Sequence, residues 1–335
     1  MIFRRVVVLK LLTTSTVLLL SLLSSAVFAQ HRILIIDSYH PEYAWVEKYR
    51  AGLEATLAGK ADLYYLSLNA KQLPSEKVDE NAETAWARFN EIKPDLVIIA
   101  DDEAVARLAV RIAETKVPTV YFGVNADARS YGLLRSEWLT GFIERPLFKR
   151  GIAFLTTLLT IPPKRVLVLW DNSGTAQRVI EQSFAGETNP TVNGIELEHR
   201  LIADENSWKA AVLAAKEQGF DAVIVGLYQS VSAEAGGIVH DRALLSWTSS
   251  HSALPLFCFW DFAIGANGTI GGLVMSAESQ GSEAARRALL ILNRRPVSHF
   301  PASVAQGSFV FSRAQLEKWQ IILPDKIKQV ARFVD

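Results

Sequence analysis

Runs of apolar residues, each followed by a polar loop and an amphipathic segment, recur along the chain. The first run, Ile33 to Ile36, has four consecutive aliphatic residues, which is typical of a strand buried on both faces of a parallel sheet. It leads into Asp37 and Ser38 and then into a helical pattern that ends near Leu57. The chain is therefore expected to open with a strand, a loop and a helix.

The same alternation continues to about residue 124. Further strands are predicted at 63–68, 95–100 and 118–124, with a helix at 79–92 and another after residue 102. This alternation has the period of βαβ units. It predicts one doubly wound α/β domain.

A polar connector at 126–138 interrupts the pattern, which starts again at Leu139. The second series repeats the topology of the first but not its residues. Its predicted strands are 139–144, 165–170, 195–201, 221–227, 254–260, 271–276 and 307–311, and its main predicted helices are 146–159, 207–218 and 278–292. We expect an α/β protein with two lobes joined by several strands, so that closure can be confined to a few hinge residues. The N-terminal lobe would comprise 30–125 plus 277–304, and the C-terminal lobe 139–272 plus 305–335.

The first 29 residues have the features of a secretory signal peptide. Three basic residues precede the apolar stretch from Leu11 to Leu23, and Val27-Phe28-Ala29 provides small residues at a cleavage spacing. We predict cleavage before Gln30 and a periplasmic product. The alternative is an uncleaved membrane anchor, for which the apolar core is short compared with the ~20 residues of a membrane-spanning helix.

Net charge and cysteine content argue against nucleic-acid binding and against chemistry at a cysteine. Removing residues 1–29 leaves 32 basic and 35 acidic side chains, a formal charge of −3, which does not favour nucleic acid as a partner. The single cysteine, Cys258, excludes an internal disulfide and lies in an apolar run that favours burial over nucleophilic or metal-binding chemistry.

The sequence contains none of the common catalytic motifs. It has no Gly-x-Ser-x-Gly elbow, phosphate-binding Gly-x-x-x-x-Gly-Lys-Ser/Thr loop, His-Glu-x-x-His or Gly-x-Gly-x-x-Gly after a strand. The glycine-rich stretch 265–272 has the spacing of a turn, and the six histidines show no metal-ligand spacing. We predict no catalytic residues, no metal site and no cofactor.

Polar and aromatic residues instead collect just after the predicted strands, where open α/β sheets bind their ligands. The candidate ligand-binding residues are Ser38, Tyr39, Asp101, Asp102, Asn125, Glu144, Asp171, Asn172, Ser173, Tyr228, Trp260 and Asp261. Each also has an ordinary interpretation, since Asp and Asn often cap helices and Trp is often core. Their shared position in both halves predicts two rims that face each other across a cleft.

The chemistry of these rims suggests a class of ligand. Aromatic faces accept apolar or cationic groups, carboxylates favour a cationic nitrogen, and helix N-termini with Ser38 and Ser173 favour an anionic group. A small zwitterion with an apolar or aromatic body satisfies all three.

Four segments resemble the type I periplasmic substrate-binding proteins of ABC transporters, in the branch that binds tryptophan or tyrosine, and the related extracellular sensor domains of histidine kinases. They are Ile33 to Trp45 (ILIIDSYHPEYAW), Thr140 to Pro146 (TGFIERP), Lys164 to Asp171 (KRVLVLWD) and Phe259 to Asp261 (FWD). The resemblance extends from Ile33 to near the C-terminus.

This resemblance implies two Rossmann-like lobes, three crossover strands and a ligand held between the lobes without catalysis. It places the ligand-contacting loops on the candidate residues named above. Some members of the family have Asn in place of Asp37 or Asp101, so the charge of the ligand stays open.

Three functional hypotheses follow. The first is a secreted receptor that closes on a small, amino-acid-like ligand and delivers it to an ABC transporter permease. The second is a periplasmic sensor that signals to a membrane histidine kinase, and in both the protein meets the membrane only through its partner. The third, a secreted two-lobed hydrolase, is disfavoured because no nucleophile and base are visible in the sequence.

Overall fold

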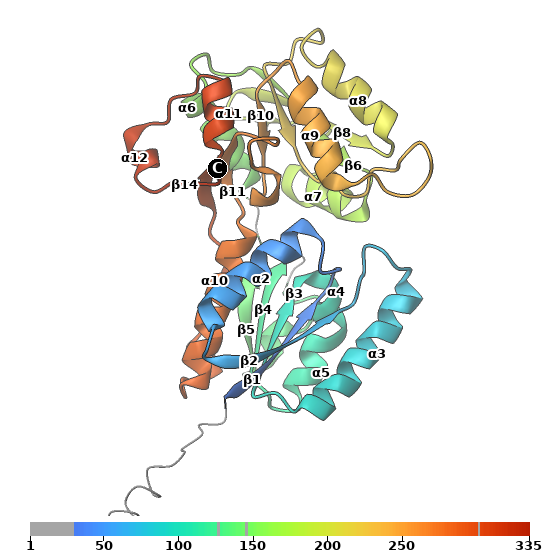
Figure 1. Cartoon of the computed structure of the whole chain (residues 1–335), viewed down its shortest axis with the longest axis vertical. Helices are drawn as coiled ribbons and strands as arrows, with labels where there is room; N and C mark the ends of the chain where they lie inside the picture. Colours follow the sequence, from blue (N-terminus) through green and yellow to red (C-terminus); the bar gives the residue numbers. More distant parts are fainter. Residues whose placement is uncertain (1–29, 126–127, 145–146, 301) are drawn as a thin grey trace, which may run out of the picture.

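The structure, a computed structural model, describes residues 30–125, 128–144, 147–300 and 302–335. Two α/β lobes lie one above the other, and the chain passes between them three times (Figure 1). The predicted fold class is therefore confirmed: two Rossmann-like lobes joined by a multi-strand hinge. The predicted signal peptide, residues 1–29, lies outside the described residues.

The first lobe is built on a six-stranded sheet in which every neighbouring pair is parallel. In sheet order its strands are β12 (Ser303–Val304), β5 (Leu139–Ile143), β4 (Thr119–Val124), β3 (Leu96–Ala100), β1 (His31–Asp37) and β2 (Ala61–Ser67). The four aliphatic residues of β1 are fully buried. Ile33 and Ile35 face one core while Leu34 and Ile36 face a second, so the unbroken apolar run reflects burial on both faces.

Strand β5 differs from the expected division of the lobes. The pattern predicts that residue 139 begins the C-terminal lobe, but β5 pairs with β4 in the sheet of the first lobe. The described part of the connector before it, 128–138, contains only the 3₁₀ turn η2 (Leu133–Arg135). Because the described part of this crossover contains no α-helix, the alternation of strand and helix is interrupted although the sheet continues.

Helices cover both faces of this sheet. One face carries α2 (Ala44–Leu57) and α10 (Ala277–Leu292). The other carries α3 (Ser75–Ile92) and a continuous helical segment that runs from α4 (Asp101–Ala104) through a π-helical turn η1 (Val105–Ala109) into α5 (Val110–Ala113).

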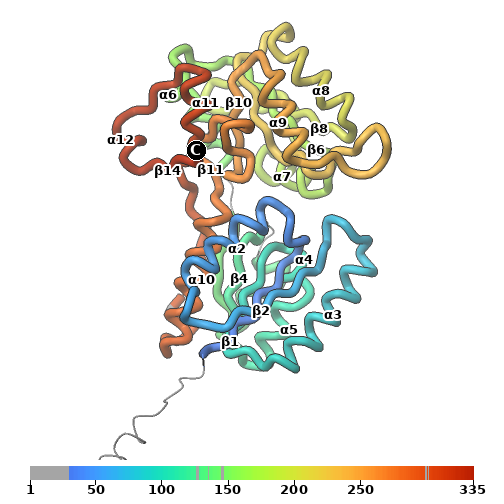
Figure 2. Tube along the Cα trace, in the orientation of Figure 1, coloured from blue at the N-terminus to red at the C-terminus, as the bar shows by residue number. Residues whose placement is uncertain are grey.

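Helices α2 and α10 are far apart in sequence but touch through their backbones. A Cβ atom at Gly52 would lie 2.2 Å from the carbonyl oxygen of Glu278, and one at Gly281 would lie 2.1 Å from that of Tyr49. Only glycine allows this approach. Helix α10 is therefore packed into the first lobe, and the orange segment in Figure 2 shows this return of the chain.

The second lobe repeats the doubly wound arrangement. Its five-stranded sheet has the order β10 (Leu256–Cys258), β9 (Ala222–Val225), β6 (Arg165–Asp171), β8 (Ile195–Ile202) and β7 (Thr191–Val192), and only the β7–β8 pair is antiparallel. Its helices are α6 (Phe148–Leu158), α7 (Gly174–Phe184), α8 (Glu205–Ala214) and α9 (Asp241–His251), followed by the 3₁₀ turn η3 (Asp261–Ala263). Cys258 is buried in β10, as its apolar surroundings predict.

The hinge side carries a small third sheet of β11 (Gly271–Val274), β13 (Ser308–Phe311) and β14 (Arg332–Phe333). The remaining short elements are η4 (Val297–His299), α11 (Arg313–Lys318) and α12 (Asp325–Lys328). Strand β11 leads into α10 of the first lobe, and the chain returns to the second lobe between β12 and β13. Among the described helices, none has both the length and the apolarity needed to cross a membrane.

Candidate functional site

The candidate site lies where the two lobes meet. Tyr43 and Trp45, at the start of α2, each place a ring 6.4 Å from that of Phe262 in η3. Beside these rings the Lys48 Nζ donates to the Asp261 carbonyl oxygen (3.1 Å). The lobes are therefore in contact along the hinge side, with aromatic rings between them. We call this region the inter-lobe site.

Asp101 is the most unusual residue of the inter-lobe site. It follows β3 with a left-handed backbone (φ 66°), and its side chain is buried. Its Oδ1 accepts a hydrogen bond from the indole N–H of Trp45 (3.0 Å), while its Oδ2 has no partner among the described residues. A Cβ atom at Gly123 would lie 2.6 Å from Oδ1, so this glycine provides the space for the carboxyl group.

Burial decides the charge state of the acids around Asp101. Burial, reinforced by Glu144 and Asp102, raises the pKa of Asp101 well above its usual value. Glu144 follows β5 and accepts a hydrogen bond from the indole N–H of Trp260 in the other lobe (2.7 Å). Burial raises the pKa of Glu144 to about 7, although the bond from Trp260 opposes this rise. The first lobe thus presents carboxyl groups that favour the neutral form unless a cation joins them.

Lys71 supplies a cation next to these acids. It lies in the loop after β2, where its Nζ donates to the hydroxyl of Tyr43 (2.7 Å) and lies 4.1 Å from the centre of that ring. Burial lowers the pKa of Lys71 to about 8, against the opposing effect of Asp171 and Asp101. Because those two acids belong to different lobes, Lys71 interacts electrostatically with both sides of the inter-lobe site.

Two aromatic candidates of the second lobe adjoin Phe262. The ring of Trp260 is stacked with that of Phe262 at 6.1 Å and an interplanar angle of 14°, and the ring of Tyr228 lies 6.0 Å from it. In the first lobe, Tyr39 packs edge-on against Tyr43 at 5.4 Å. The aromatic walls expected from the sequence therefore extend to the lobe boundary.

Other candidates are bonded within one lobe. The Ser38 hydroxyl donates to the Ala100 carbonyl (2.7 Å) and accepts from the Ala104 N–H (2.8 Å), so it joins β3 to the helix that follows. Asp102 accepts from the backbone N–H of Asn125 (3.0 Å).

The same holds at the end of β6. Ser173 caps α7, since its hydroxyl oxygen accepts from the backbone N–H of Ala176 (3.2 Å). Asn172 is exposed, and its Oδ1 accepts from the amide of Gln177 (3.2 Å). Capping, the ordinary interpretation of such residues, describes these two contacts.

Asp171 and Asp261 have both carboxylate oxygens engaged by the protein. Asp171 accepts from the hydroxyl of Ser173 (2.6 Å) and from the backbone N–H of Ser230 (3.0 Å). The Oδ2 of Asp261 accepts from the Ser276 hydroxyl (2.7 Å) and the Arg332 guanidinium (3.0 Å) at the hinge, and its Oδ1 accepts from the backbone N–H of Ala277 (3.3 Å).

Five residues of the inter-lobe site were not among the candidates: Tyr43, Trp45, Lys48, Lys71 and Phe262. Lys71 lies four residues beyond the carboxyl end of β2, in the region where α/β sheets are expected to bind ligands. A lysine in a polar loop, however, does not stand out in the sequence. Phe262 directly follows the candidate pair Trp260 and Asp261, and Tyr43 lies within the segment that opens the fold.

Together these groups suit binding better than catalysis. A partnerless carboxylate oxygen, a neighbouring ammonium group and several ring faces can hold a small molecule by charge, hydrogen bonds and stacking. No group of three His, Cys, Asp or Glu side chains within the described part of the chain is placed to hold a metal ion.

No protein-family model matches the sequence, and no curated protein does. Solved structures match along most of its length. An open, ligand-free substrate-binding protein with adhesive properties from Clostridium difficile has a TM-score of 0.61 at 15% identity, covering 91% of this chain and 99% of that chain.

Two ligand-bound structures are also similar. An ABC domain in complex with L-Trp from Streptococcus pneumonia has a TM-score of 0.59 at 14% identity, covering 91% of this chain and 100% of that chain. A carbohydrate transporter from Acidothermus cellulolyticus in complex with myo-inositol has a TM-score of 0.55 at 16% identity, covering 90% and 96%. These neighbours are binding proteins for small molecules, and the chain shares with them the fold of the type I periplasmic binding proteins.

Proposed function

We propose that this protein is a periplasmic solute receptor that closes on a small zwitterion, such as an amino acid with an apolar or aromatic side chain. The observation that carries the proposal is the Oδ2 of Asp101, a buried acceptor without a partner among the described residues at the junction of the lobes. Leaving such a group unpaired costs about 1–3 kcal/mol. A ligand that donates an N–H⁺ to it recovers that cost.

The neighbours of Asp101 complement the rest of such a ligand. Lys71 offers a cation to a carboxylate. Tyr43, Trp260 and Phe262 offer ring faces to an apolar body. A bound ammonium group would also favour the charged forms of Asp101 and Glu144, whose pKa values burial raises in the free protein.

Delivery to an ABC transporter permease is part of this proposal. Its support is the shared fold with substrate-binding proteins of transporters. The hinge provides the two states, open and closed, that a permease has to distinguish.

A thermal-shift screen tests the ligand class. The protein is unfolded and refolded to remove carried-over ligand, then screened against amino acids, amines, nucleosides and neutral sugars. Aromatic or apolar amino acids should raise the melting temperature by mass action and lower the radius of gyration in solution scattering. Hits confined to neutral sugars would refute the zwitterion, and a hit that left the scattering unchanged would contradict closure.

An ATPase assay tests whether the partner is an ABC transporter. Purified receptor loaded with the best hit should stimulate ATP hydrolysis by the ABC transporter encoded nearest to it, and unloaded receptor should do so less. If the loaded receptor instead changes autophosphorylation of a membrane histidine kinase, the sensor alternative replaces the transporter.

A further inference from the structure

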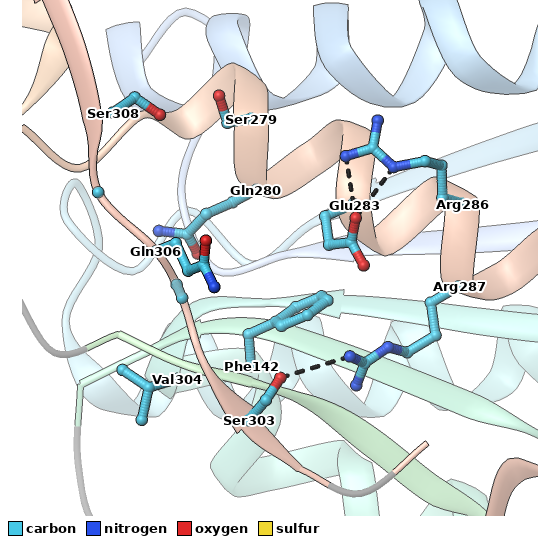
Figure 3. A pocket seen from close by; sticks show the side chains of 12 residues that line it. Phe142, Ser279, Gln280, Glu283, Arg286, Arg287, Ser303, Val304, Gln306 and Ser308 are labelled. Atoms are coloured by element: carbon cyan, nitrogen blue, oxygen red, sulfur yellow. Dashed lines mark hydrogen bonds and ion pairs between the residues drawn. The ribbon is translucent and has the colours of Figure 1, made fainter. Parts of the chain in front are cut away.

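A cavity lies at the hinge. It has a volume of about 440 Å³ and is bounded by α10, by Phe142 of β5 and by the segment 303–308 that crosses between the lobes (Figure 3). None of the inter-lobe residues Asp101, Lys71 and Phe262 lines it.

Arg287 is the central group of this hinge cavity. It is 8% exposed. Its Nη1 donates to the hydroxyl of Thr140 (3.0 Å) and the carbonyl of Gly141 (3.1 Å), and its Nη2 donates to the hydroxyl of Ser303 (3.4 Å). All these acceptors are neutral, and within the described ranges no carboxylate forms an ion pair with Arg287.

A buried cation is normally matched by an anion, because removing the charge from water is costly. The Phe142 ring, 4.0 Å from the guanidinium carbon, compensates in part through its π face. It supplies no negative charge. The Glu283 carboxylate on the same wall favours the charged form of Arg287, but it is bonded to Arg286. The pocket wall therefore has two guanidinium groups for one carboxylate.

Gln280 adds a second indication. It is 4% exposed, and although it lies near enough to Glu144 to favour the charged form of that acid, neither atom of its amide has a well-formed hydrogen bond in the described structure. Figure 3 shows its side chain turned toward Gln306 of the crossing segment. An amide N–H₂ in that position is a ready donor for an oxygen ligand.

We propose that the hinge cavity binds a small oxyanion, a carboxylate or phosphate group, between Arg287 and Gln280. Arg286 also lies on the wall, where its guanidinium pairs with Glu283 at 2.9 Å, so the three charged side chains of the rim leave one positive charge in excess. An anion held there contacts both α10 and the segment that leads into β13. It therefore ties the first lobe to a strand of the hinge.

Isothermal titration with inorganic phosphate and, separately, with succinate tests this site, at constant ionic strength set by chloride. The wild-type protein should bind one anion, and the preferred probe separates a phosphate from a carboxylate ligand. Arg287→Gln should weaken binding at least tenfold, and Arg286→Gln a few-fold. Lys326→Gln, which removes an exposed charge from α12, is the matched control and should bind as the wild type does.

Gln280→Leu keeps the test decisive if Arg287→Gln does not fold. It removes the partnerless amide without a change of charge, so anion binding should weaken several-fold while the melting temperature without anion is unchanged or higher. The proposal is overturned if neither anion binds more tightly than chloride, or if Arg286→Gln and Gln280→Leu both bind like the wild type. It is also overturned if Lys71→Met abolishes binding while Arg287→Gln keeps it, because the anion would then lie in the inter-lobe site.

Discussion

Asp101 and Asp171 occupy similar places in the two lobes, each at the carboxyl end of a strand in the interior of its sheet. Asp171 is satisfied by its own lobe, through Ser173 and Ser230. Asp101 receives one hydrogen bond, from Trp45, and keeps one oxygen without a partner in the described structure. The two aspartates look alike in the sequence and differ in their donors.

The difference gives a criterion for the proposed site: a strand-end carboxylate oxygen is available to a ligand where the fold supplies no donor to it. Asp37 and Asp261 resemble Asp171, because other residues of the protein donate hydrogen bonds to their carboxylates. Asp37 accepts from the hydroxyl of Tyr49 (2.7 Å) and pairs with Arg50. We therefore rank Asp101 above the other aspartates as a ligand contact, and the experiments below test that ranking.

The largest expected effect concerns the acids kept neutral in the first lobe. Folding raises the pKa of Glu144 from 4.5 to about 7, so between these values the folded protein binds more protons than the unfolded chain. Its contribution to stability is complete below about pH 4.5 and is lost as the pH rises through 7. Denaturant titrations should show that Glu144→Gln removes about 2–3 kcal/mol of the stability difference between pH 5 and pH 8.

Glu187→Gln, at an exposed position of the second lobe, is the control and should leave the pH profile as it is. An unchanged profile in Glu144→Gln would mean that burial does not hold this acid neutral.

The next effect separates the two aspartates by stability. Asp171→Ala leaves the donors of Ser173 and Ser230 without their acceptor and should lower the free energy of unfolding by about 2 kcal/mol. Asp101→Asn replaces a carboxyl group that burial already favours in its neutral form by an amide of nearly the same shape, whose oxygen can still accept from Trp45, so the stability should stay about equal. Chemical denaturation of both variants measures their free energies of unfolding. An equal loss in both would remove the distinction between the two residues.

Ligand affinity should show the reverse order. With the amino acid that gives the largest shift in the screen, Asp101→Asn should bind about tenfold more weakly, a loss of about 1.4 kcal/mol, because a charge-assisted hydrogen bond becomes a neutral one. Titration calorimetry measures this change. Asp171→Asn, compared at the same ligand concentration, should bind within about two-fold of the wild type if its role is structural.

The smallest effect tests the space around Asp101. Gly123 and Gly132 both have positive φ (72° and 70°), so alanine at either position should cost about 1 kcal/mol of stability. Only at Gly123 does the new Cβ meet the Asp101 carboxyl, because at Gly132 its nearest contact is a Val110 methyl group at 3.4 Å. Gly123→Ala should therefore weaken ligand binding while Gly132→Ala should not. A matching loss of affinity in both variants would assign the effect to backbone strain alone.

Most of the fold was predictable because the burial of a strand or helix leaves a pattern of apolar residues that can be read in the local sequence. Ile33 to Ile36 and residues 166–170 are apolar runs typical of a strand covered on both faces, and both are buried strands. Strand β5 was assigned to the wrong lobe because its crossover lacks a helix, and the pairing that places it in the first sheet is not local.

The candidate site was less predictable, since donors come from distant segments. The strand-end argument found Asp101, but it gave the same weight to Asp171 and Asp261, whose partners Ser230 and Arg332 lie 59 and 71 residues away. No local sequence pattern shows that these distant residues donate hydrogen bonds to the two aspartates. Lys71 was overlooked for a related reason: its importance arises from the carboxylates around it, which belong to other loops.

The backbone contact at Gly52 and Gly281 has a consequence for biosynthesis. Helix α2 is made early, but its packing partner α10 emerges only after nearly the whole second lobe has been translated. At roughly 5–20 residues per second, this face of the first sheet has only α2 over it for on the order of ten seconds or more. During that interval the apolar surface that α10 later covers is accessible to chaperones, and premature termination before residue 277 leaves a first lobe without α10.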